Sequence, residues 1–155
     1  MTRIIAGEAR GRRLVAPKGE TTRPTSDRAK EAIFSSWSTR FGLEGTRVLD
    51  LFAGSGALGL EAASRGARSV VLVENDPNAI AAIEKNIRTV GHPDVAVSPM
   101  KVSSYLAGAP GAVVTVERHR DDDETQWPEG YEQLQQKLKR RIHGMARFDT
   151  AIYNA

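Results

Sequence analysis

Apolar residues gather in three short runs along the first two thirds of the chain, and helical patterns separate them. The runs are Arg47-Val48-Leu49, Ser69–Val73 and Val95–Ser98. The second run is continuous, as expected of a parallel strand that is covered on both faces. Helices are predicted over Ala57–Ser64, over Pro77–Val90 with Asp76 as its N-cap and, more briefly, over Ser103–Ala107. Strands that alternate with helices require right-handed crossovers, so the pattern predicts an α/β domain with a Rossmann-like parallel sheet.

The N-terminal residues predict a hairpin ahead of this core. Thr2–Ala6 and Arg12–Ala16 have the composition of two short strands, and Gly7–Gly11 joins them. After a loop, Thr25 or Ser26 is expected to cap a helix. The apolar residues of that helix recur every four positions, at Ala29, Ile33, Trp37 and Phe41. The 155 residues have the length of one domain, which we divide into a basic hairpin (residues 1–22) and a Rossmann-like core (residues 23–155).

A glycine-rich turn joins the first core strand to the first core helix. Residues 50–61 read Asp-Leu-Phe-Ala-Gly-Ser-Gly-Ala-Leu-Gly-Leu-Glu, which contains the pattern G-x-G-x-x-G. Glycines at such a turn allow backbone N–H groups to approach a ligand closely, where a Cβ would block it. Glu74 ends the next strand twenty residues after Gly54, which is the position of an acid that holds ribose hydroxyls. Dinucleotides and S-adenosylmethionine both fit this outline.

Asp50 decides between the two cofactor classes. A dinucleotide would place its pyrophosphate at the turn, where a neighbouring carboxylate would repel it. S-adenosylmethionine carries no phosphate, and Asp50 at the end of the strand can pair with its α-ammonium group while Glu74 holds the ribose. The simpler interpretation is an ordinary turn in a domain without a nucleotide, but the glycines, the leading Asp50 and the trailing Glu74 together favour S-adenosylmethionine. This argument would fail if the Asp50 carboxylate were turned into the protein interior.

Three segments together resemble a known family. Val48–Glu61 resembles the cofactor motif of class I methyltransferases, and Arg23-Pro-Thr-Ser-Asp-Arg28 and Glu31-Ala-Ile-Phe34 extend the likeness to the RsmD family. That family methylates the exocyclic amine of a guanine in 16S ribosomal RNA. The resemblance runs from Thr2 to about Leu106 and resumes from Gly111, where Gly111–Glu117 resembles the fifth strand of the family's sheet. Tyr131, Leu134 and Leu138 have helical spacing, although the family resemblance favours a strand there.

The resemblance implies the contacts of the cofactor and of the RNA. Class I methyltransferases often place an acid after the third strand, near the adenine amine, but Lys101 stands there, so backbone groups around Val102 would bind the adenine. The expected cofactor-binding residues are Asp50, Phe52, Ala53, Gly54, Ser55, Gly56, Glu74, Asn75 and Val102. The family's hairpin helps to hold RNA, which assigns Arg10, Arg12, Arg13 and Arg23 to RNA binding through phosphates. A lid over the cofactor is an alternative for Arg23, as are helix capping and a local ion pair.

Charge and composition agree with an RNA-binding protein without requiring one. The net charge is +3, but residues 1–30 carry eight basic side chains against three acids. A second basic cluster comprises Lys137, Lys139, Arg140, Arg141 and Arg147. Such segments suit a polyanion, here 16S RNA or an assembling small subunit, although a solvated face has the same composition. The chain has no cysteine, which excludes disulfides and suits the cytoplasm. We expect a monomer without a metal and without a membrane span.

One part of the resembled family is missing. An amino-methyltransferase must hold a weakly nucleophilic amine in line with the methyl group, at roughly 3–3.5 Å. The family does so with Asp/Asn-Pro-Pro-Tyr after its fourth strand, whereas no two of the seven prolines here are adjacent. A strand–helix unit is therefore predicted to be absent near residues 108–111, between the first and fifth strands of the sheet. Its loss would leave two unpaired edges within the sheet. The catalytic residues stay unknown.

Three explanations of the gap stay open. The 155 residues could be two segments of a longer chain, a damaged gene product, or a remnant that binds without catalysing. We favour the first because an interrupted sheet should fold poorly, and it requires a Cα–Cα step well beyond ~3.8 Å between Gly108 and Gly111. The leading function is therefore a 16S ribosomal RNA (guanine-N2) methyltransferase, and the alternative is a non-catalytic protein that binds cofactor or RNA. A nicotinamide-dependent oxidoreductase fits the glycines but is opposed by Asp50.

Overall fold

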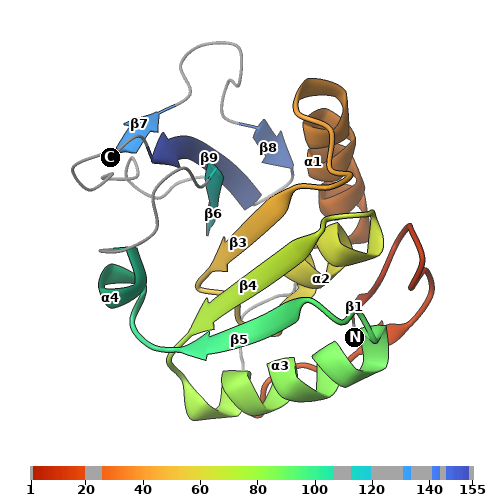
Figure 1. Ribbon diagram of the computed structural model, residues 1–155, viewed down its shortest axis with the longest axis vertical. Coiled ribbons are helices and arrows are strands. Elements are labelled where there is room, and N and C mark those ends of the chain that lie inside the picture. The colour runs from red at the N-terminus through yellow and green to blue at the C-terminus, as the bar shows by residue number, and fades with distance from the viewer. Residues whose placement is uncertain are drawn as a thin grey trace.

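A computed structural model describes residues 2–19 and 26–106, together with the backbone of four later strands within residues 113–153. Its centre is a parallel sheet in the order β3-β4-β5 (Figure 1). These strands are β3 (Arg47–Leu51), β4 (Ser69–Glu74) and β5 (Val95–Pro99). Leu49 lies opposite Val71, and Val71 lies opposite Ala96. The predicted α/β fold with a parallel sheet is confirmed.

The helices begin and end where their local sequences dictate. Helix α3 (Pro77–Val90) starts at Asp76, whose side chain accepts hydrogen bonds from the amides of Asn78 and Ala79, and it ends at Gly91 in the left-handed conformation. Helix α1 (Asp27–Arg40) is capped by Ser26, which accepts from Ala29 N. The other helices of the described residues are α2 (Ala57–Ser64) and the short α4 (Val102–Leu106). The caps proposed at Ser26 and Asp76 are therefore present.

Strand β4 is buried on both faces, as its continuous apolar sequence predicted. On one face Val70 and Leu72 pack in the main core, which includes Phe34, Leu60 and Ile83 from the three long helices. On the other face Val73 packs in a smaller cluster that includes β3 and α4 residues. The second cluster comprises Leu49, Leu51 and Val73, with Val71, Val102, Tyr105 and Leu106 packed against it. Helices on both sides therefore hold the sheet and fix its carboxyl edge.

A second, antiparallel group of strands follows the parallel sheet. Strand β9 (Ala146–Tyr153) pairs with β6 (Val113–His119), β7 (Tyr131–Gln133) and β8 (Arg141–His143). Strand β6 corresponds to the strand expected from Gly111, and β7 shows that Tyr131 lies in a strand. Strand β6 approaches β3, but among the described strands no hydrogen-bonded ladder joins β3 to any strand except β4. Residues 107–112, where the missing unit was placed, lie outside the described residues, so that unit stays a prediction.

The N-terminal hairpin is shorter than predicted and is part of the core. Strand β1 (Thr2–Arg3) pairs with β2 (Arg13–Leu14), where five residues had been expected in each strand. Ile4 and Leu14 are buried in the main core. The strands are short because side chains of the helices bind backbone groups that a longer ladder would use. The segment comprising residues 2–19 is called the N-terminal segment below.

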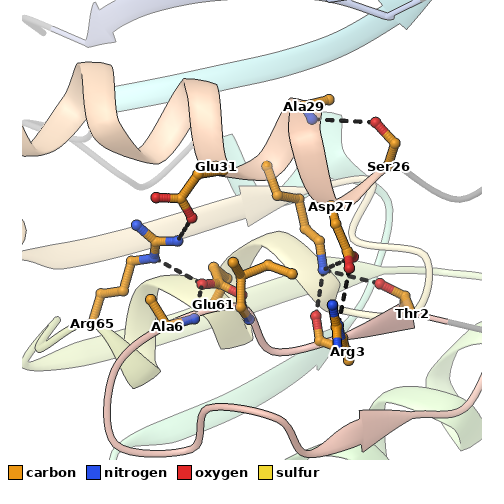
Figure 2. A network of polar contacts seen from close by, with 11 residues as sticks. Thr2, Arg3, Ala6, Ser26, Asp27, Ala29, Glu31, Glu61 and Arg65 are labelled. Atoms are coloured by element: carbon orange, nitrogen blue, oxygen red, sulfur yellow. Dashed lines mark hydrogen bonds and ion pairs between the residues drawn. The ribbon is translucent and has the colours of Figure 1, made fainter.

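Helices α1, α2 and α3 each contribute at least one buried polar side chain that anchors the N-terminal segment. From α1, Lys30 Nζ donates to Thr2 Oγ1 at 3.0 Å and to the Arg3 carbonyl at 2.5 Å. From α2, the Glu61 carboxylate accepts from the amides of Ile5 and Ala6 at 2.8 and 3.0 Å. From α3, Asn86 binds both backbone groups of Val15. Figure 2 shows Glu61 between Ala6 and Arg65, and it shows Thr2 and Arg3 of the segment close to Asp27 of α1.

Charged neighbours complete the network drawn in Figure 2. Arg65 donates Nε to Glu61 at 2.7 Å and Nη2 to Glu31 at 2.8 Å, so the Glu61 charge is paired. Asp27 pairs with Arg3 at 3.0 Å and lies 3.9 Å from Lys30 Nζ. Burial lowers the pKa of Lys30, and the Glu61 and Asp27 carboxylates only partly offset that effect. Lys30 is thus fully buried, and it donates to two acceptors in the N-terminal segment against a desolvation cost.

Gly7 has no room for a side chain, because the segment touches the end of α2 there. A Cβ at Gly7 would lie 1.8 Å from the Ser64 carbonyl oxygen, and the backbone is left-handed with φ +84°. Gly11 has nearly the same φ, +83°, but open space around its Cβ position. Gly7→Ala should therefore destabilise the protein by more than about 3 kcal/mol, and Gly11→Ala by about 1 kcal/mol. Urea unfolding of both variants measures the difference, and equal midpoints would contradict the close contact.

The buried ammonium of Lys30 predicts a pH dependence of stability. Since the pKa of Lys30 is lowered on folding, the unfolded chain binds the proton more tightly than the folded chain does. Between that lowered pKa and 10.5, stability should rise with pH. The unfolding free energy of the native chain minus that of Lys30→Met should therefore increase as pH rises through this window. Chemical denaturation across the alkaline range measures the difference, and a constant difference would refute the buried charge.

Candidate functional site

The loop between β3 and α2, residues 52–56, forms the centre of the candidate site and is called the glycine loop below. Phe52 has φ 54°, which is unusual for a residue with a side chain, and the residue is 67% exposed. Gly54 and Gly56 have φ values of 57° and 77°. A left-handed residue other than glycine costs roughly 1–2 kcal/mol. Strain of this kind is concentrated at functional sites, so Phe52 makes the loop a candidate for one.

Strand β4 holds the glycine loop through its last two residues. Ala53 N donates to the Val73 carbonyl at 3.1 Å, and Gly54 N donates to Glu74 Oε2 at 2.9 Å. The other Glu74 oxygen accepts from the amides of Asn75 and Asp76 at 2.8 and 3.0 Å. The structure thus brings together Gly54 and Glu74, which the twenty-residue spacing had paired. Whether Glu74 binds a ribose stays a prediction.

Asp50 has a structural role that the sequence argument did not anticipate. Its Oδ2 atom accepts a hydrogen bond from Gly59 N at 2.8 Å, and the residue is 9% exposed. The first amides of a helix lack partners within the helix, and Gly56, at the N-cap of α2, has no side chain to supply one. Asp50 supplies it from the adjacent strand. Asp50 is therefore turned toward the interior, so its charge no longer decides between S-adenosylmethionine and a dinucleotide, and direct pairing with a ligand ammonium stays a prediction.

Gly59 allows α2 to pack closely on the sheet. A Cβ there would lie 2.3 Å from Leu72 Cδ2 and 2.9 Å from Val70 Cγ1. The third glycine of a G-x-G-x-x-G turn is required for such close helix–strand packing. The three glycines of the pattern thus have distinct roles: Gly54 and Gly56 adopt left-handed conformations, and Gly59 makes room.

Asn86 on α3 also contacts the glycine loop, and sequence reasoning missed it. Its Nδ2 group donates to the Ser55 carbonyl and to the Val15 carbonyl, both at 2.9 Å, and its Oδ1 accepts from Val15 N at 2.8 Å. Asn86 is 1% exposed. A signal existed, because Asn86 follows Ile83 by three residues and so lies in the buried stripe of α3. A polar residue in an apolar stripe needs buried partners.

The remaining predicted cofactor contacts line the same edge. Asn75 is exposed directly after β4, and Val102 begins α4 directly after β5 and its turn. Glu74 and Pro99 lie opposite each other at the ends of their strands. Residues 50–56, 74–75 and 102 therefore gather along the carboxyl ends of β3, β4 and β5. Ligands of open α/β sheets bind at this edge.

The predicted RNA-binding arginines lie elsewhere. Arg12 Nη1 donates to the Thr89 and Val90 carbonyls at 2.9 and 2.6 Å, at the end of α3. Arg10 and Arg13 are exposed. Helices α2 and α3 run back from the carboxyl edge, and α3, with 14 residues, is about 20 Å long. The tip of the hairpin thus lies against the C-terminal ends of α2 and α3, where Gly7 approaches Ser64 and Arg12 binds Thr89 and Val90.

Arg23 lies outside the described residues. Arg12 has a structural contact, since it binds the last carbonyls of α3 in the way a C-terminal cation does. No contact with RNA is tested for any of the four arginines, so their assignment stays a prediction.

An apolar cavity of about 300 Å³ lies between α1, α2 and β3. Its lining includes Trp37, Phe41, Leu49, Asp50, Leu58 and Gly59. Phe41, predicted to be on the buried face of α1, is 44% exposed. The cavity therefore lies beside β3, which has no second hydrogen-bonded neighbour among the described strands.

In the described residues, no group of three or more His, Cys, Asp or Glu could hold a metal ion. No helix in that part of the chain is long and apolar enough to span a membrane.

Known proteins share both the sequence and the fold. A family model described as "Conserved hypothetical protein 95" matches residues 2–108. Ribosomal RNA small subunit methyltransferase D of Escherichia coli K12 is 40% identical over 117 residues, which are 74% of this chain and 58% of that protein. The Haemophilus influenzae protein of the same name is 44% identical over 88 residues, 57% of this chain and 45% of that protein. The chain thus spans about half the length of these curated relatives.

Two solved structures match almost the whole chain. The Escherichia coli protein yhhF has a TM-score of 0.75 at 25% identity, covering 99% of this chain and 98% of that chain. A hypothetical protein of Thermus thermophilus has a TM-score of 0.73 at 26% identity, covering 98% of this chain and 99% of that chain. The similarity therefore includes the part of the fold after residue 108 as well as the glycine loop.

Proposed function

The chain belongs to the RsmD family of class I methyltransferases, which use S-adenosylmethionine, and we propose that it binds this cofactor at the glycine loop. The transfer of the methyl group to ribosomal RNA is part of the same proposal. The observation that carries it is the hydrogen bond between Gly54 N and Glu74 Oε2, which brings the loop and the ribose-binding acid together. The Glu74 carboxylate suits the ribose hydroxyls that S-adenosylmethionine provides.

The proposed residue roles follow from the geometry. The glycine loop would lie against the amino-acid part of the cofactor, with the Asp50 carboxylate near its ammonium. Glu74 would accept hydrogen bonds from the ribose hydroxyls with oxygens that now bind the Gly54, Asn75 and Asp76 amides. Asn75 and Val102, at the ends of the next elements, would border the adenine. Every proposed contact thus lies on one edge of the sheet.

The proposed substrate is the exocyclic amine of a guanine in 16S ribosomal RNA. The guanine would have to leave its base stack to reach this edge. Arg10, Arg13 and the segment containing Arg23 would bind phosphates, which position RNA without reading its sequence. A substrate bound across both ends of α3 would have to span about 20 Å, which is the length of that helix. The protein would act as a monomer in the cytoplasm, on free RNA or on an assembling small subunit.

One observation favours a second function. The sequence has no Asp/Asn-Pro-Pro-Tyr segment, which in this family accepts the amine N–H groups and stacks on the base. The 155-residue chain alone would then bind cofactor or RNA without transferring a methyl group. A longer chain containing the segment would be a methyltransferase of the expected kind.

Cofactor binding tests the first part of the proposal. We expect S-adenosylhomocysteine, but not NAD, to bind in calorimetry. Glu74→Gln should weaken S-adenosylhomocysteine about tenfold, because charge-assisted hydrogen bonds to ribose and to the loop are lost. Glu84→Gln removes the same charge from an exposed site on α3 and should have no effect. Equal affinities of the two variants, or tighter binding of NAD, would refute this cofactor site.

Methyl transfer tests the second part. Labelled S-adenosylmethionine should transfer its methyl group to 16S RNA or to small-subunit particles, and nucleoside analysis should find N2-methylguanosine. A folded sample that binds S-adenosylhomocysteine but methylates neither the 16S RNA nor the small-subunit particles would support the non-catalytic alternative. Intact mass measured on the same sample shows whether the purified protein exceeds 16.9 kDa and so contains residues beyond these 155.

A further inference from the structure

The side chain of Asn86 links the N-terminal segment to the glycine loop, because it binds Val15 of the segment and Ser55 of the loop. We infer that Asn86 is a positioning residue, which fixes the Ser55 carbonyl and thereby holds the glycine loop ready for its cofactor. The inference rests on the proposed function for the identity of the cofactor, but not for the effect on the loop. It also changes the role of the N-terminal segment, which becomes a support of the cofactor site as well as a candidate RNA contact.

The geometry of Asn86 uses the whole amide group. Its oxygen accepts from Val15 N, and its two N–H groups donate to the Val15 and Ser55 carbonyls. Only a side-chain amide offers an acceptor and two donors in one plane. Because Asn86 is 1% exposed, water cannot easily replace a lost partner. The three bonds thus tie α3, the N-terminal segment and the glycine loop to one atom group.

The Ser55 carbonyl accepts its hydrogen bond from Asn86, outside the loop. Gly54 and Gly56 flank Ser55, and glycine restricts the backbone least of all residues. Strand β4 binds Ala53 and Gly54 on one side of Ser55, and Asp50 binds Gly59 on the other. Asn86 is the side chain that binds between these two attachments. Without it, the peptide after Ser55 would sample more orientations, and binding would have to order it.

Other anchors of the N-terminal segment provide a matched comparison. Ser64 on α2 accepts from Ala9 N at 2.9 Å and donates to the Ala6 carbonyl at 2.6 Å. Like Asn86, Ser64 is a buried polar residue whose side chain both donates a hydrogen bond to the segment and accepts one from it. Ser64 is the last residue of α2, whereas the glycine loop precedes its first residue. Ser64→Ala therefore loosens the segment without removing a contact of the loop.

The experiment compares Asn86→Leu and Asn86→Asp with Ser64→Ala. Leucine has nearly the shape of asparagine and keeps none of its hydrogen bonds, whereas aspartate keeps the acceptor for Val15 N and loses both amide donors. Calorimetry with S-adenosylhomocysteine should show about a tenfold loss of affinity for Asn86→Leu, and a loss for Asn86→Asp that diminishes at low pH as the carboxyl gains a proton to donate. Ser64→Ala should keep the native affinity within about twofold. Thermal unfolding is measured for all three.

A second measurement needs no cofactor. Amide hydrogen exchange of the ligand-free protein should be faster at residues 53–59 in Asn86→Leu than in Ser64→Ala, at matched overall stability. Equal exchange in this stretch, or equal losses of affinity in the two variants, would overturn the inference and leave Asn86 as an ordinary core anchor. If the native protein binds no S-adenosylhomocysteine, the proposed cofactor is wrong, and the exchange result alone then decides whether Asn86 positions the loop. An Asn86→Leu variant too unstable to study leaves Asn86→Asp, compared in the same two measurements.

Discussion

The turn between β3 and α2 makes only part of its backbone hydrogen bonds internally, from Gly56 N to the Ala53 carbonyl at 2.7 Å, and neighbouring elements supply partners for other groups. A strand ends at Leu51 and a helix begins at Ala57, which leaves loop and first-turn N–H groups without partners in either element. Glu74 of β4 accepts from Gly54, Asp50 of β3 accepts from Gly59, and Asn86 of α3 donates to Ser55. Three neighbouring elements thus fix one short loop. A ligand that binds the loop meets a backbone already held in place.

The N-terminal segment is held in a similar way, because side chains of the helices bind its backbone groups. The buried side chains of Lys30, Glu61 and Asn86 come from three different helices, and each binds a backbone group of the N-terminal segment. Buried charges are costly, so Glu61 is paired with Arg65 and Lys30 is surrounded by oxygen atoms. Removing one partner of such a set exposes the full desolvation cost of the other. The segment is therefore fixed by specific contacts, in a position that only a glycine at residue 7 permits.

Much of the fold could be predicted from the sequence, because periodicity and caps are local. The strand Ser69–Val73, the helix Ala57–Ser64 and the cap at Asp76 were all predicted and are all present. The hairpin strands were predicted too long, since side chains of distant helices bind the backbone of Ile5 and Val15. Such contacts between residues more than fifty positions apart leave no local signal.

The site was predicted in outline but not in its hydrogen bonds. The pairing of Gly54 with Glu74 follows from a known spacing, whereas the bond from Gly59 to Asp50 depends on how α2 packs against β3. A crystal structure with S-adenosylhomocysteine tests the account most directly. We predict that the ribose hydroxyls lie on the Glu74 carboxylate and the amino-acid tail lies against residues 52–56. A ligand bound away from the carboxyl ends of β3 and β4, or a Glu74 side chain turned away from it, would contradict the account.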